Sequence, residues 1–428
     1  MQSETPEMVL SRAARRNFFA NLIDVSFFAF GINMVSRYTV LPYFVGSINN
    51  NPLLLSLIPM LTQVGWLLPQ LFTAPYIKTL PRRKPYVLLM TAIERIPFLV
   101  FGLLLLFGKD LPGSLMLSAF FIGYAIHTFF AGFTATAWQD MIARVIPGKR
   151  WGIFFGLSSA IGAVLGIFSA KVTDFVLESM SFPNNVGLLS LLCFVGLTIS
   201  FSGLAATVEP AQPTQPREPM MPYLRSLPPL LKKDKGFRNY LITRTALSLS
   251  FLGHSFVTAG SMLRFDISLW LGTYLAAQLA SQALSDVVMG TLADRWGHKQ
   301  VLKLANLIGV LALVASVLAP SPEWLIGAYV LIGIATSGYQ LSGYTLVMTF
   351  STDDQRPTYI GLANTALAPV GFFGPLLLGA LASRGGYNML FLFSAVIGAI
   401  ALALLQWWVP DVRRQEQATE QASQSASA

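Results

Sequence analysis

Residues 290–299 read GTLADRWGHK, a charged segment set between two long apolar stretches. The segment contains Gly290, Asp294, Arg295, Gly297 and Lys299. A charged turn at this place is unexpected in so apolar a sequence. Of the 428 residues, 54% are hydrophobic and 11% are charged, with a mean hydropathy of +0.59. This composition is typical of a polytopic membrane protein and excludes an ordinary soluble domain.

Apolar stretches long enough to cross a bilayer, which requires about 20 residues per helix, recur along the whole chain. They are continuous and contain Gly and Pro, which favours helices over the alternating pattern of a membrane β-barrel. We therefore predict an all-α protein with twelve transmembrane helices. The expected spans are 17–44, 51–77, 86–108, 113–142, 152–177, 184–208, 237–262, 267–293, 301–319, 323–350, 359–382 and 387–410.

The spans fall into two groups of six, separated by a segment rich in proline and then in basic residues. Proline interrupts helices, so this segment is expected to be a linker. The last residues are polar, have nothing to bury, and are expected to be disordered. The predicted parts are an N-terminal segment 1–16, a six-helix bundle 17–208, a linker 209–236, a second six-helix bundle 237–412 and a tail 413–428.

Most of the 29 lysines and arginines lie in the two termini, the linker and the loops on the same side of the predicted spans. Basic residues concentrate on the cytoplasmic side of membrane proteins, so both termini are expected in the cytoplasm and the protein in the plasma membrane. Topology and contact with anionic lipid explain the net charge of +9. The basic residues are not concentrated in one surface, so the sequence does not indicate nucleic-acid binding. The single cysteine, Cys193, excludes an internal disulfide.

Two short cytoplasmic turns recur in the same order in both groups. The turn at 290–299 is matched by APYIKTLPRRK at 74–84, and PGKRWGIFFGL at 147–157 is matched by DDQRPTYIGL at 353–362. With these turns and its six plus six spans, the chain resembles the major facilitator superfamily, whose signature turn reads G-x-L-A-D-R-x-G-R-K. The resemblance covers nearly the whole chain. It implies two pseudo-symmetric six-helix bundles around a central cavity.

In that family the Asp and Arg of the turn bond to helix ends across the bundle interface and hold the outward-open state. The resemblance therefore implies a conformational latch here. Its residues would be Gly290, Asp294, Arg295, Gly297 and Lys299. The first-half turn has Ala74, Lys78 and Pro81 where the family has Gly, Asp and Gly, which leaves only a basic turn. The alternative for both copies is a solvated turn that fixes topology.

Polar side chains inside membrane spans are costly, and each is by default a functional hypothesis. Six such residues lie near the middle of spans that the resemblance places around the central cavity, where repeat-built transporters bind substrate. The expected substrate-cavity residues are Asn33, Gln63, His127, Gln278, Gln282 and Gln340. For each of them the alternative is an interhelical hydrogen bond worth about 1 kcal/mol.

Asp24 and Arg244 each lie near the cytoplasmic end of the first helix of their group, so a two-fold relation places them at similar depth. We expect them to pair across the cavity as a gate when the cytoplasmic side is closed. The alternative is that each has a partner within its own half. His127 lies in a span and belongs to the residue type that titrates near neutral pH. Asp24 and His127 are therefore the expected proton carriers.

Other polar residues in the spans suggest structural roles. Glu94 and Arg95 are adjacent on the third span and are expected to pair within the first half. Asp140 is expected to bind the arginines of the neighbouring basic turns. His254 is expected to be a satisfied interhelical hydrogen-bond donor.

Catalytic and nucleotide-binding motifs are missing from the sequence: there is no P-loop, H-E-x-x-H or G-x-S-x-G. We therefore expect neither an enzyme nor a cofactor or metal site. The resemblance implies secondary-active transport of a small organic solute by a monomer embedded in lipid, with protons as the candidate coupling ion. The alternatives are a drug-type proton antiporter and a non-transporting sensor. The Gly-Pro pair that marks such antiporters in span 5 is missing there, and Gly374-Pro375 occurs in span 11 instead.

Overall fold

The computed structural model describes residues 6–77, 79–108, 110–147, 150–212, 229, 231–350 and 356–411, and their regular structure is helical. The first half contains α1 (Pro6–Met34), α2 (Val40–Ile48), α3 (Pro52–Ile77), α4 (Lys84–Phe107), α5 (Gly113–Val145), α6 (Trp151–Ser179) and α7 (Asn184–Ala206). The second half contains α9 (Lys235–Leu252), η2 (Gly253–Phe256), α10 (Val257–Met262), η3 (Ser268–Trp270), α11 (Leu271–Trp296), α12 (His298–Leu318), α13 (Pro322–Met348) and α14 (Arg356–Trp407).

Helices occupy all twelve predicted spans, which confirms the all-α fold class. Spans 11 and 12 are the two parts of α14, which breaks at Gly386, where φ is 74°. Eight helical segments of the described chain are long and apolar enough to cross a membrane by length and composition. The helix α1 already begins at Pro6, a residue type suited to the first turn of a helix. Most of the predicted linker and the whole predicted tail lie outside the described residues.

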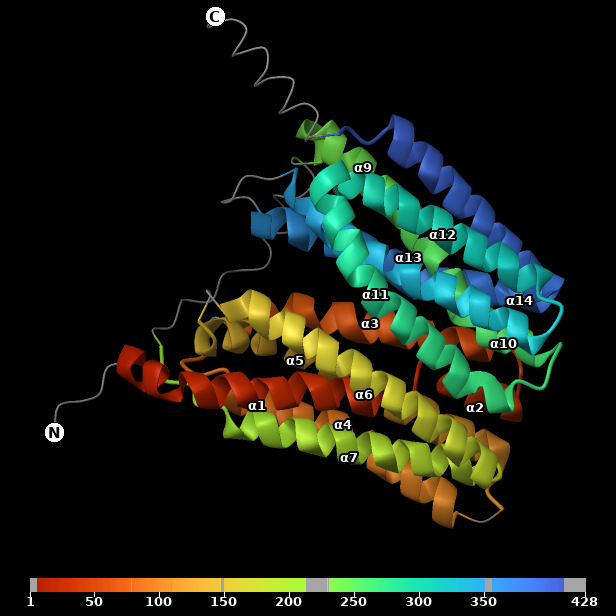
Figure 1. The fold of residues 1–428 in the computed structure, drawn as a ribbon, viewed down its shortest axis with the longest axis horizontal. Helices are drawn as coiled ribbons and strands as arrows, with labels where there is room; N and C mark the ends of the chain where they lie inside the picture. Colours follow the sequence, from red (N-terminus) through yellow and green to blue (C-terminus); the bar gives the residue numbers. More distant parts are fainter. Residues whose placement is uncertain are drawn as a thin grey trace, which may run out of the picture.

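The two halves form separate helical bundles that lie side by side (Figure 1). At one end of the molecule α1 begins, α7 ends, α9 begins and α14 ends; we call this the linker end. The opposite end, where α2 and α10 lie, is the far end. Figure 1 shows that the two bundles come together at the far end and diverge toward the linker end.

Span 1 is divided into two helices by a break at residues 35–39. In a continuous helix the ring of Pro42 would clash with the carbonyl of Tyr38, four residues earlier. The helix therefore stops at Met34, and the backbone N–H groups of Thr39 and Leu41 both bond to the carbonyl of Ser36. Pro42 instead lies in the first turn of α2, where its missing N–H is tolerated. The break leaves the carbonyl of Tyr38 available to other partners.

Span 7 of the second half is interrupted at the corresponding place. Between α9 and α10 the chain forms the short 3₁₀ segment η2, which begins at Gly253. A Cβ at Gly253 would lie 2.7 Å from the hydroxyl of Ser394, so only glycine fits against α14 here. One turn later, the hydroxyl of Thr258 donates a hydrogen bond to the backbone oxygen of Tyr38. The two interrupted helices thus meet across the interface between the halves.

The halves also pack through two pairs of long helices, α3 with α14 and α6 with α11. Near the far end these pairs approach through glycines. A Cβ at Gly272 would lie 2.2 Å from the carbonyl oxygen of Ala170, and one at Gly379 would lie 2.8 Å from that of Pro52. Nearby, Tyr387 donates a hydrogen bond to the side-chain oxygen of Asn50. The far end is therefore closed by direct backbone contact between the halves.

Candidate functional site

A cavity lies between the two halves, beside both helix breaks. Its empty volume, which includes space open to solvent, is about 490 Å³. The first half contributes residues of the first break and of α3, and the second half contributes residues of α9, η2 and α13. The described lining residues are Arg37, Tyr38, Ile58, Pro59, Thr62, Gln63, Ser248, Phe251, Leu252, Ser255 and Tyr339.

The lining combines aromatic faces with polar groups. Phe251 and Tyr339 stack with ring centroids 4.5 Å apart and form an aromatic surface on the second half. On the first half, the guanidinium of Arg37 lies 4.8 Å from the centre of the Tyr38 ring and donates a hydrogen bond of 3.0 Å to its hydroxyl. Thr62 shares a 2.7 Å hydrogen bond with Tyr124, which lies behind the cavity wall. Such a surface suits a small solute that has both a planar part and polar groups.

The cavity is closed toward the far end by the break residues themselves. Tyr38 is one of the residues that line the cavity, and its carbonyl accepts a hydrogen bond from Thr258. The hydroxyl of Tyr329 contacts Thr258 as well, and the Tyr329 ring stacks on Tyr274 at a centroid distance of 4.8 Å. Rigid aromatic packing in the second half thus supports the hydrogen bond that joins the halves.

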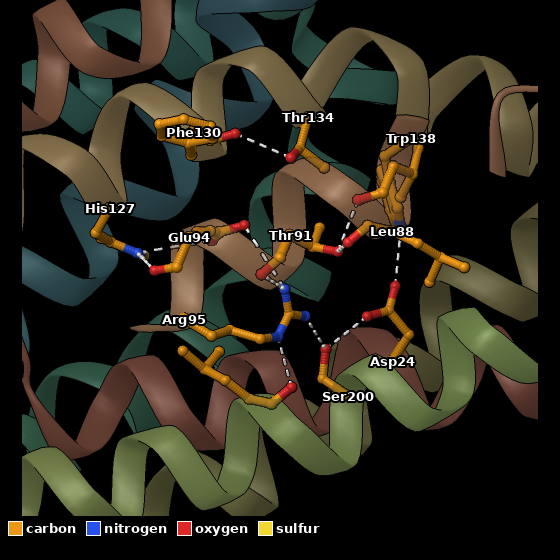
Figure 2. Close-up of polar contacts among 12 residues, drawn as sticks. Asp24, Leu88, Thr91, Glu94, Arg95, His127, Phe130, Thr134, Trp138 and Ser200 are labelled. Atoms are coloured by element: carbon orange, nitrogen blue, oxygen red, sulfur yellow. Dashed lines mark hydrogen bonds and ion pairs between the residues drawn. The ribbon is translucent and has the colours of Figure 1, made fainter. Parts of the chain in front are cut away.

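A second polar site lies inside the first half, away from that cavity. Asp24 of α1 is buried there and accepts hydrogen bonds from two other helices (Figure 2). Trp138 Nε1 of α5 donates to Asp24 Oδ2 at 2.8 Å, and Ser200 Oγ of α7 donates to Asp24 Oδ1 at 2.6 Å. Asp24 therefore joins α1, α5 and α7 within one bundle.

Arg95 of α4 extends this network across the bundle. Its Nη2 donates to Ser200 Oγ at 3.1 Å, and its Nε donates to the carbonyl of Leu197 at 2.7 Å (Figure 2). Its Nη1 donates to the carbonyl of Thr91 at 2.6 Å. Because Ser200 bonds both Arg95 and Asp24, the buried cation and the buried carboxylate are connected through one hydroxyl.

Glu94 and His127 form the other end of the network. Glu94 Oε1 lies 3.7 Å from His127 Nδ1, and Glu94 Oε2 lies 3.8 Å from Arg95 Nη1. The same His127 nitrogen is 3.3 Å from the Glu94 carbonyl oxygen, and the ring packs edge-on against Phe98. The pairing of Glu94 and Arg95 within the first half, expected from the sequence, is confirmed. One histidine, two carboxylates and one arginine are thus buried together in this bundle.

A hollow of about 570 Å³ empty volume borders this network. Asp24, Glu94, Arg95 and Trp138 are among its lining residues, and most of its surface is apolar. Charged groups beside a hollow within a membrane bundle mark functional sites more often than structural ones. The network is therefore a candidate for ion coupling rather than for substrate binding, because the cavity between the halves is lined by other residues.

Of the six polar residues expected around the substrate, Gln63 is among the described lining residues of the central cavity. Asn33 is half-buried and donates a hydrogen bond to the carbonyl of Ala29, one turn earlier on α1. His127 is buried in the charge network. Gln278 is buried on α11, Gln282 is half-buried, and Gln340 is exposed on α13 next to Tyr339. Substrate contact by these residues stays a prediction.

The gate expected between Asp24 and Arg244 also stays a prediction. In this structure the hydrogen-bond partners of Asp24 are Trp138 and Ser200, both in its own half. Arg244 is buried on α9, one helical turn from the buried Tyr240. The expected pair belongs to a state in which the linker end is closed, whereas in this structure the far end is closed.

The turn at 290–299 of the second half is described except for the side chain of Asp294. Gly297 ends α11 with φ of 86°, a conformation that favours glycine, as the motif predicts. Arg295 is exposed, and Gly290 has open space beside it. Lys299 is buried and donates a 2.7 Å hydrogen bond to the carbonyl of Val409. Lys299 therefore fastens the start of α12 to the end of α14 within the second half.

The matching region of the first half contains an ion-pair cluster. Arg83 Nε lies 2.7 Å from Asp140 Oδ2, and Arg144 Nη2 lies 3.1 Å from the same oxygen. Glu209, at the start of the predicted linker, accepts hydrogen bonds from the backbone N–H groups of Arg83 and Lys84. The expected pairing of Asp140 with the arginines of the basic turns is confirmed. A carboxylate at the start of α4 also compensates the positive end of the helix dipole.

Sequence reasoning missed most of the cavity lining. Arg37 fell inside a predicted span and received no role, and Tyr38, Phe251 and Tyr339 look like ordinary apolar-helix residues. One signal was available: Arg37 and Pro42 lie five residues apart in an apolar stretch, where a charge and a helix breaker together indicate an interrupted helix.

Comparison with solved structures shows that this arrangement, two helical halves side by side, is a known fold. A mutant form of the nucleoside transporter NupG superposes with a TM-score of 0.71 at 13% identity, covering 92% of this chain and 100% of that one. A D-xylose-proton symporter superposes with a TM-score of 0.67 at 13% identity, covering 95% and 99%. At this identity the likeness concerns the fold alone.

Sequence comparison finds similarity to membrane transport proteins over part of the chain. Residues 246–427 match the family model of the Major Facilitator Superfamily. The inner membrane metabolite transport protein YgcS of Escherichia coli K12 is 27% identical over 168 residues, 36% of each chain. A methylenomycin A resistance protein of Streptomyces coelicolor is 33% identical over 119 residues, 28% of this chain and 25% of that one. The matches thus span about a third or less of these curated relatives.

Proposed function

We propose that the protein is a secondary-active transporter that moves a small organic solute across a membrane by alternating access. The observation that carries the proposal is the cavity between the halves, which is lined by both and closed at the far end by the two interrupted helices. A cavity shared by two rigid bundles can open to either side when the bundles tilt against each other. Relatives whose names denote metabolite transport or drug resistance support this class of function.

The direct test is transport by the purified protein in sealed liposomes. A mixture of small metabolites is supplied outside, and solutes retained inside are identified by mass spectrometry after an ion gradient is imposed. Accumulation of a solute that protein-free liposomes do not accumulate supports the proposal. If the protein binds solutes but never moves them in either direction, the non-transporting sensor is the better interpretation, whereas export of diverse drugs in exchange for protons would establish the antiporter alternative.

The structure corresponds to one state of the proposed cycle. By sequence, most basic residues outside the predicted spans fall on the side of the two termini and the linker, which the positive-inside rule assigns to the cytoplasm. In the structure α1 begins and α14 ends at the linker end. If the protein lies in the plasma membrane with both termini in the cytoplasm, the far end faces the outside of the cell. In this structure the far end is closed. The proposed state is therefore open toward the cytoplasm.

The hydrogen bond from Thr258 to Tyr38 should hold this state. Replacing Thr258 by Val keeps the shape and removes the donor, which is worth about 1 kcal/mol net. We expect about fivefold more of the outward-open state, measured as faster labelling of a Ser255→Cys reporter by an impermeant maleimide from the far side, in a Cys193→Ser background. Thr243→Val is the matched control, because among the described residues the Thr243 hydroxyl donates to the carbonyl of Asn239, one turn earlier on the same helix. Equal labelling rates in the two variants would show that the bond does not stabilise closure.

We further propose that protons drive transport through the buried network of the first half. Asp24 and His127 are the carriers proposed from the sequence, and the structure adds Glu94 between His127 and Arg95. The charged or titratable groups that face Glu94 are Asp24 of α1, Arg95 of α4, His127 of α5 and Cys193 of α7. A proton bound here would change the charge of a site packed between four helices, which is a direct way to alter how they pack.

An imposed pH gradient is expected to drive solute accumulation in liposomes. The Asp24→Asn variant is expected to reduce that accumulation at least about tenfold. The variant should still exchange solute when the concentrations on the two sides are equal. The amide keeps the acceptor for Trp138 or Ser200 but carries no titratable proton. Asp266→Asn, which removes an exposed carboxylate at the far end, is the control. Concentrative transport that survives collapse of the gradient by an ionophore would exclude protons as the driving ion.

We propose, from the family motif, that Asp294 acts as a latch in the outward-open state. Asp294→Asn is isosteric and far from the cavity, so transport should fall about tenfold while solute affinity stays within about twofold. Thr291→Val, on the same helix, is the control because its hydroxyl bonds to the neighbouring carbonyl of Val288. Transport rates of the Asn variant that match those of the control would leave the turn with a topological role alone.

A further inference from the structure

A carboxylate lies inside a membrane-spanning helix of the first half, at the interface with the second half. Asp174 of α6 is half-buried and lies five residues before the end of the span Ala160–Ser179, or roughly 7.5 Å along the helix. A charged side chain inside a span is costly and is by default a functional hypothesis. The helix α11 of the second half packs along α6 (Figure 1). The contacts of Asp174 with α11 indicate what this charge does.

The first turn of α11 has no side-chain cap of its own. The first backbone N–H groups of a helix find no carbonyl within that helix, and a Ser, Thr, Asp or Asn at the N-cap often accepts from them. The N-cap residue of α11 is Trp270, whose side chain makes no capping hydrogen bond. The N–H groups of Gly272 and Thr273, the second and third residues of α11, can therefore take an acceptor from another element.

Asp174 supplies this acceptor from the other half. Its carboxylate faces the backbone N–H groups of Gly272 and Thr273, and the Thr273 hydroxyl donates to Asp174 Oδ2 at 3.4 Å. A Cβ at Gly272 would lie 2.2 Å from Asp174 Oδ1, so the carboxylate approaches this closely only because residue 272 is glycine. Oδ1 makes no hydrogen bond of good geometry with a described residue. The attraction is therefore chiefly that between a negative charge and the positive end of a helix dipole.

The local alternative for Asp174 is an ion pair within α6. Lys171, one turn earlier on the same helix, is exposed and attracts the carboxylate. Glu178, one turn later, is exposed as well. The groups that contact the carboxylate directly, however, belong to Gly272 and Thr273 of the second half. The geometry thus favours a role between the halves over a role within α6.

We propose that Asp174 is a latch that holds the far end closed by capping the start of α11 across the interface. When the halves separate at the far end, the carboxylate and the helix start both lose their partner, which favours the closed arrangement. This proposal rests on the alternating access proposed above, because a latch requires an end that can open. Asp294, at the linker end, is proposed to hold the opposite state, so the two carboxylates would bias the cycle in opposite directions.

The first test removes the charge of Asp174 and keeps its shape. Asp174→Asn is combined with the Ser255→Cys reporter in a Cys193→Ser background, and labelling by an impermeant maleimide from the far side is timed in liposomes. We expect labelling about three to ten times faster than in the parent protein, because the contact between charge and helix dipole is lost. The controls Glu178→Gln and Lys171→Gln remove exposed charges of α6 and should label within about twofold of the parent.

A second measurement does not depend on the asparagine variant. Asp174→Cys and Thr273→Cys are combined in the Cys193→Ser background and treated with a short bifunctional methanethiosulfonate. This pair should cross-link efficiently, because the two native side chains touch across the interface. The pair Glu178→Cys with Thr273→Cys is the control and should cross-link poorly. Adding Thr258→Val, which is expected to open the far end, should lower the yield of the first pair.

Labelling of Asp174→Asn that matches Glu178→Gln would overturn the latch, as would equal cross-linking of the two cysteine pairs. A response of Lys171→Gln as large as that of Asp174→Asn would assign the carboxylate to a local ion pair and would also overturn it. These outcomes leave alternating access intact when Thr258→Val speeds labelling. If the reporter is never labelled from the far side in any variant, the far end does not open, and alternating access fails together with the latch.

Discussion

Replacing Arg95 by Met is expected to lower the thermal unfolding midpoint of the detergent-solubilised protein by roughly 10 °C. Arg95 is 4% exposed and donates hydrogen bonds to α4 and α7. Its removal leaves the carboxylates of Glu94 and Asp24 buried without their cation. Removing one partner of a buried charged group costs about 3–5 kcal/mol, which corresponds to a shift of this size in a bundle of this length.

The double variant Arg95→Met with Glu94→Gln should recover part of the loss, because it removes one uncompensated charge. Arg238→Met is the matched control, since Arg238 is exposed on α9. Scanning fluorimetry of the purified variants measures the midpoints. If Arg95→Met unfolds at the same temperature as Arg238→Met, the network does not hold the first half together.

Separate removal of the charges of Asp24 and Arg244 is expected to reduce transport more than tenfold, and exchanging the two should restore much of it. The proposed pair forms when the linker end closes, and a poorly solvated single charge would favour the cytoplasm-open state. Attraction within a pair depends on the distance between the charges and not on which helix carries which sign. The exchanged variant is Asp24→Arg with Arg244→Asp.

The measurement is a double-mutant cycle on transport rate and on cysteine labelling from each side of the membrane, in a Cys193→Ser background. The structure sharpens the cycle, because Asp24 already has Trp138 and Ser200 as partners in the far-end-closed state. The Ser200→Ala variant therefore serves as a control for loss of the local bonds. Additive losses, with no rescue by the exchange, would show that Asp24 and Arg244 act independently.

The spans and their grouping are predictable from the sequence because hydrophobicity over about 20 residues is a local property. Local chemistry also predicts that Asp140 binds the nearby arginines. His254 is likewise the expected interhelical donor, since its Nε2 lies 2.9 Å from the carbonyl of Gly309.

The site is harder to predict because it depends on which helices meet. Polarity singled out Gln63 but overlooked Tyr38 and Phe251, which line the cavity beside the two helix interruptions. In the sequence, the members of the buried charge network of the first half are polar residues on different spans, with no sign that they are connected. Its connection runs through Ser200, a residue whose small hydroxyl gives no signal in an apolar stretch.

The glycine contacts at the far end offer a way to open, by mutation, the end that is closed in this structure. Gly272 and Gly379 face carbonyl oxygens of the other half with no room for a methyl group. A bulky residue at either position would act as a wedge that props the outer side open, while each bundle keeps its own interior packing. Such a variant would be a conformational trap, suited to selecting antibodies or crystals of the outward-open form.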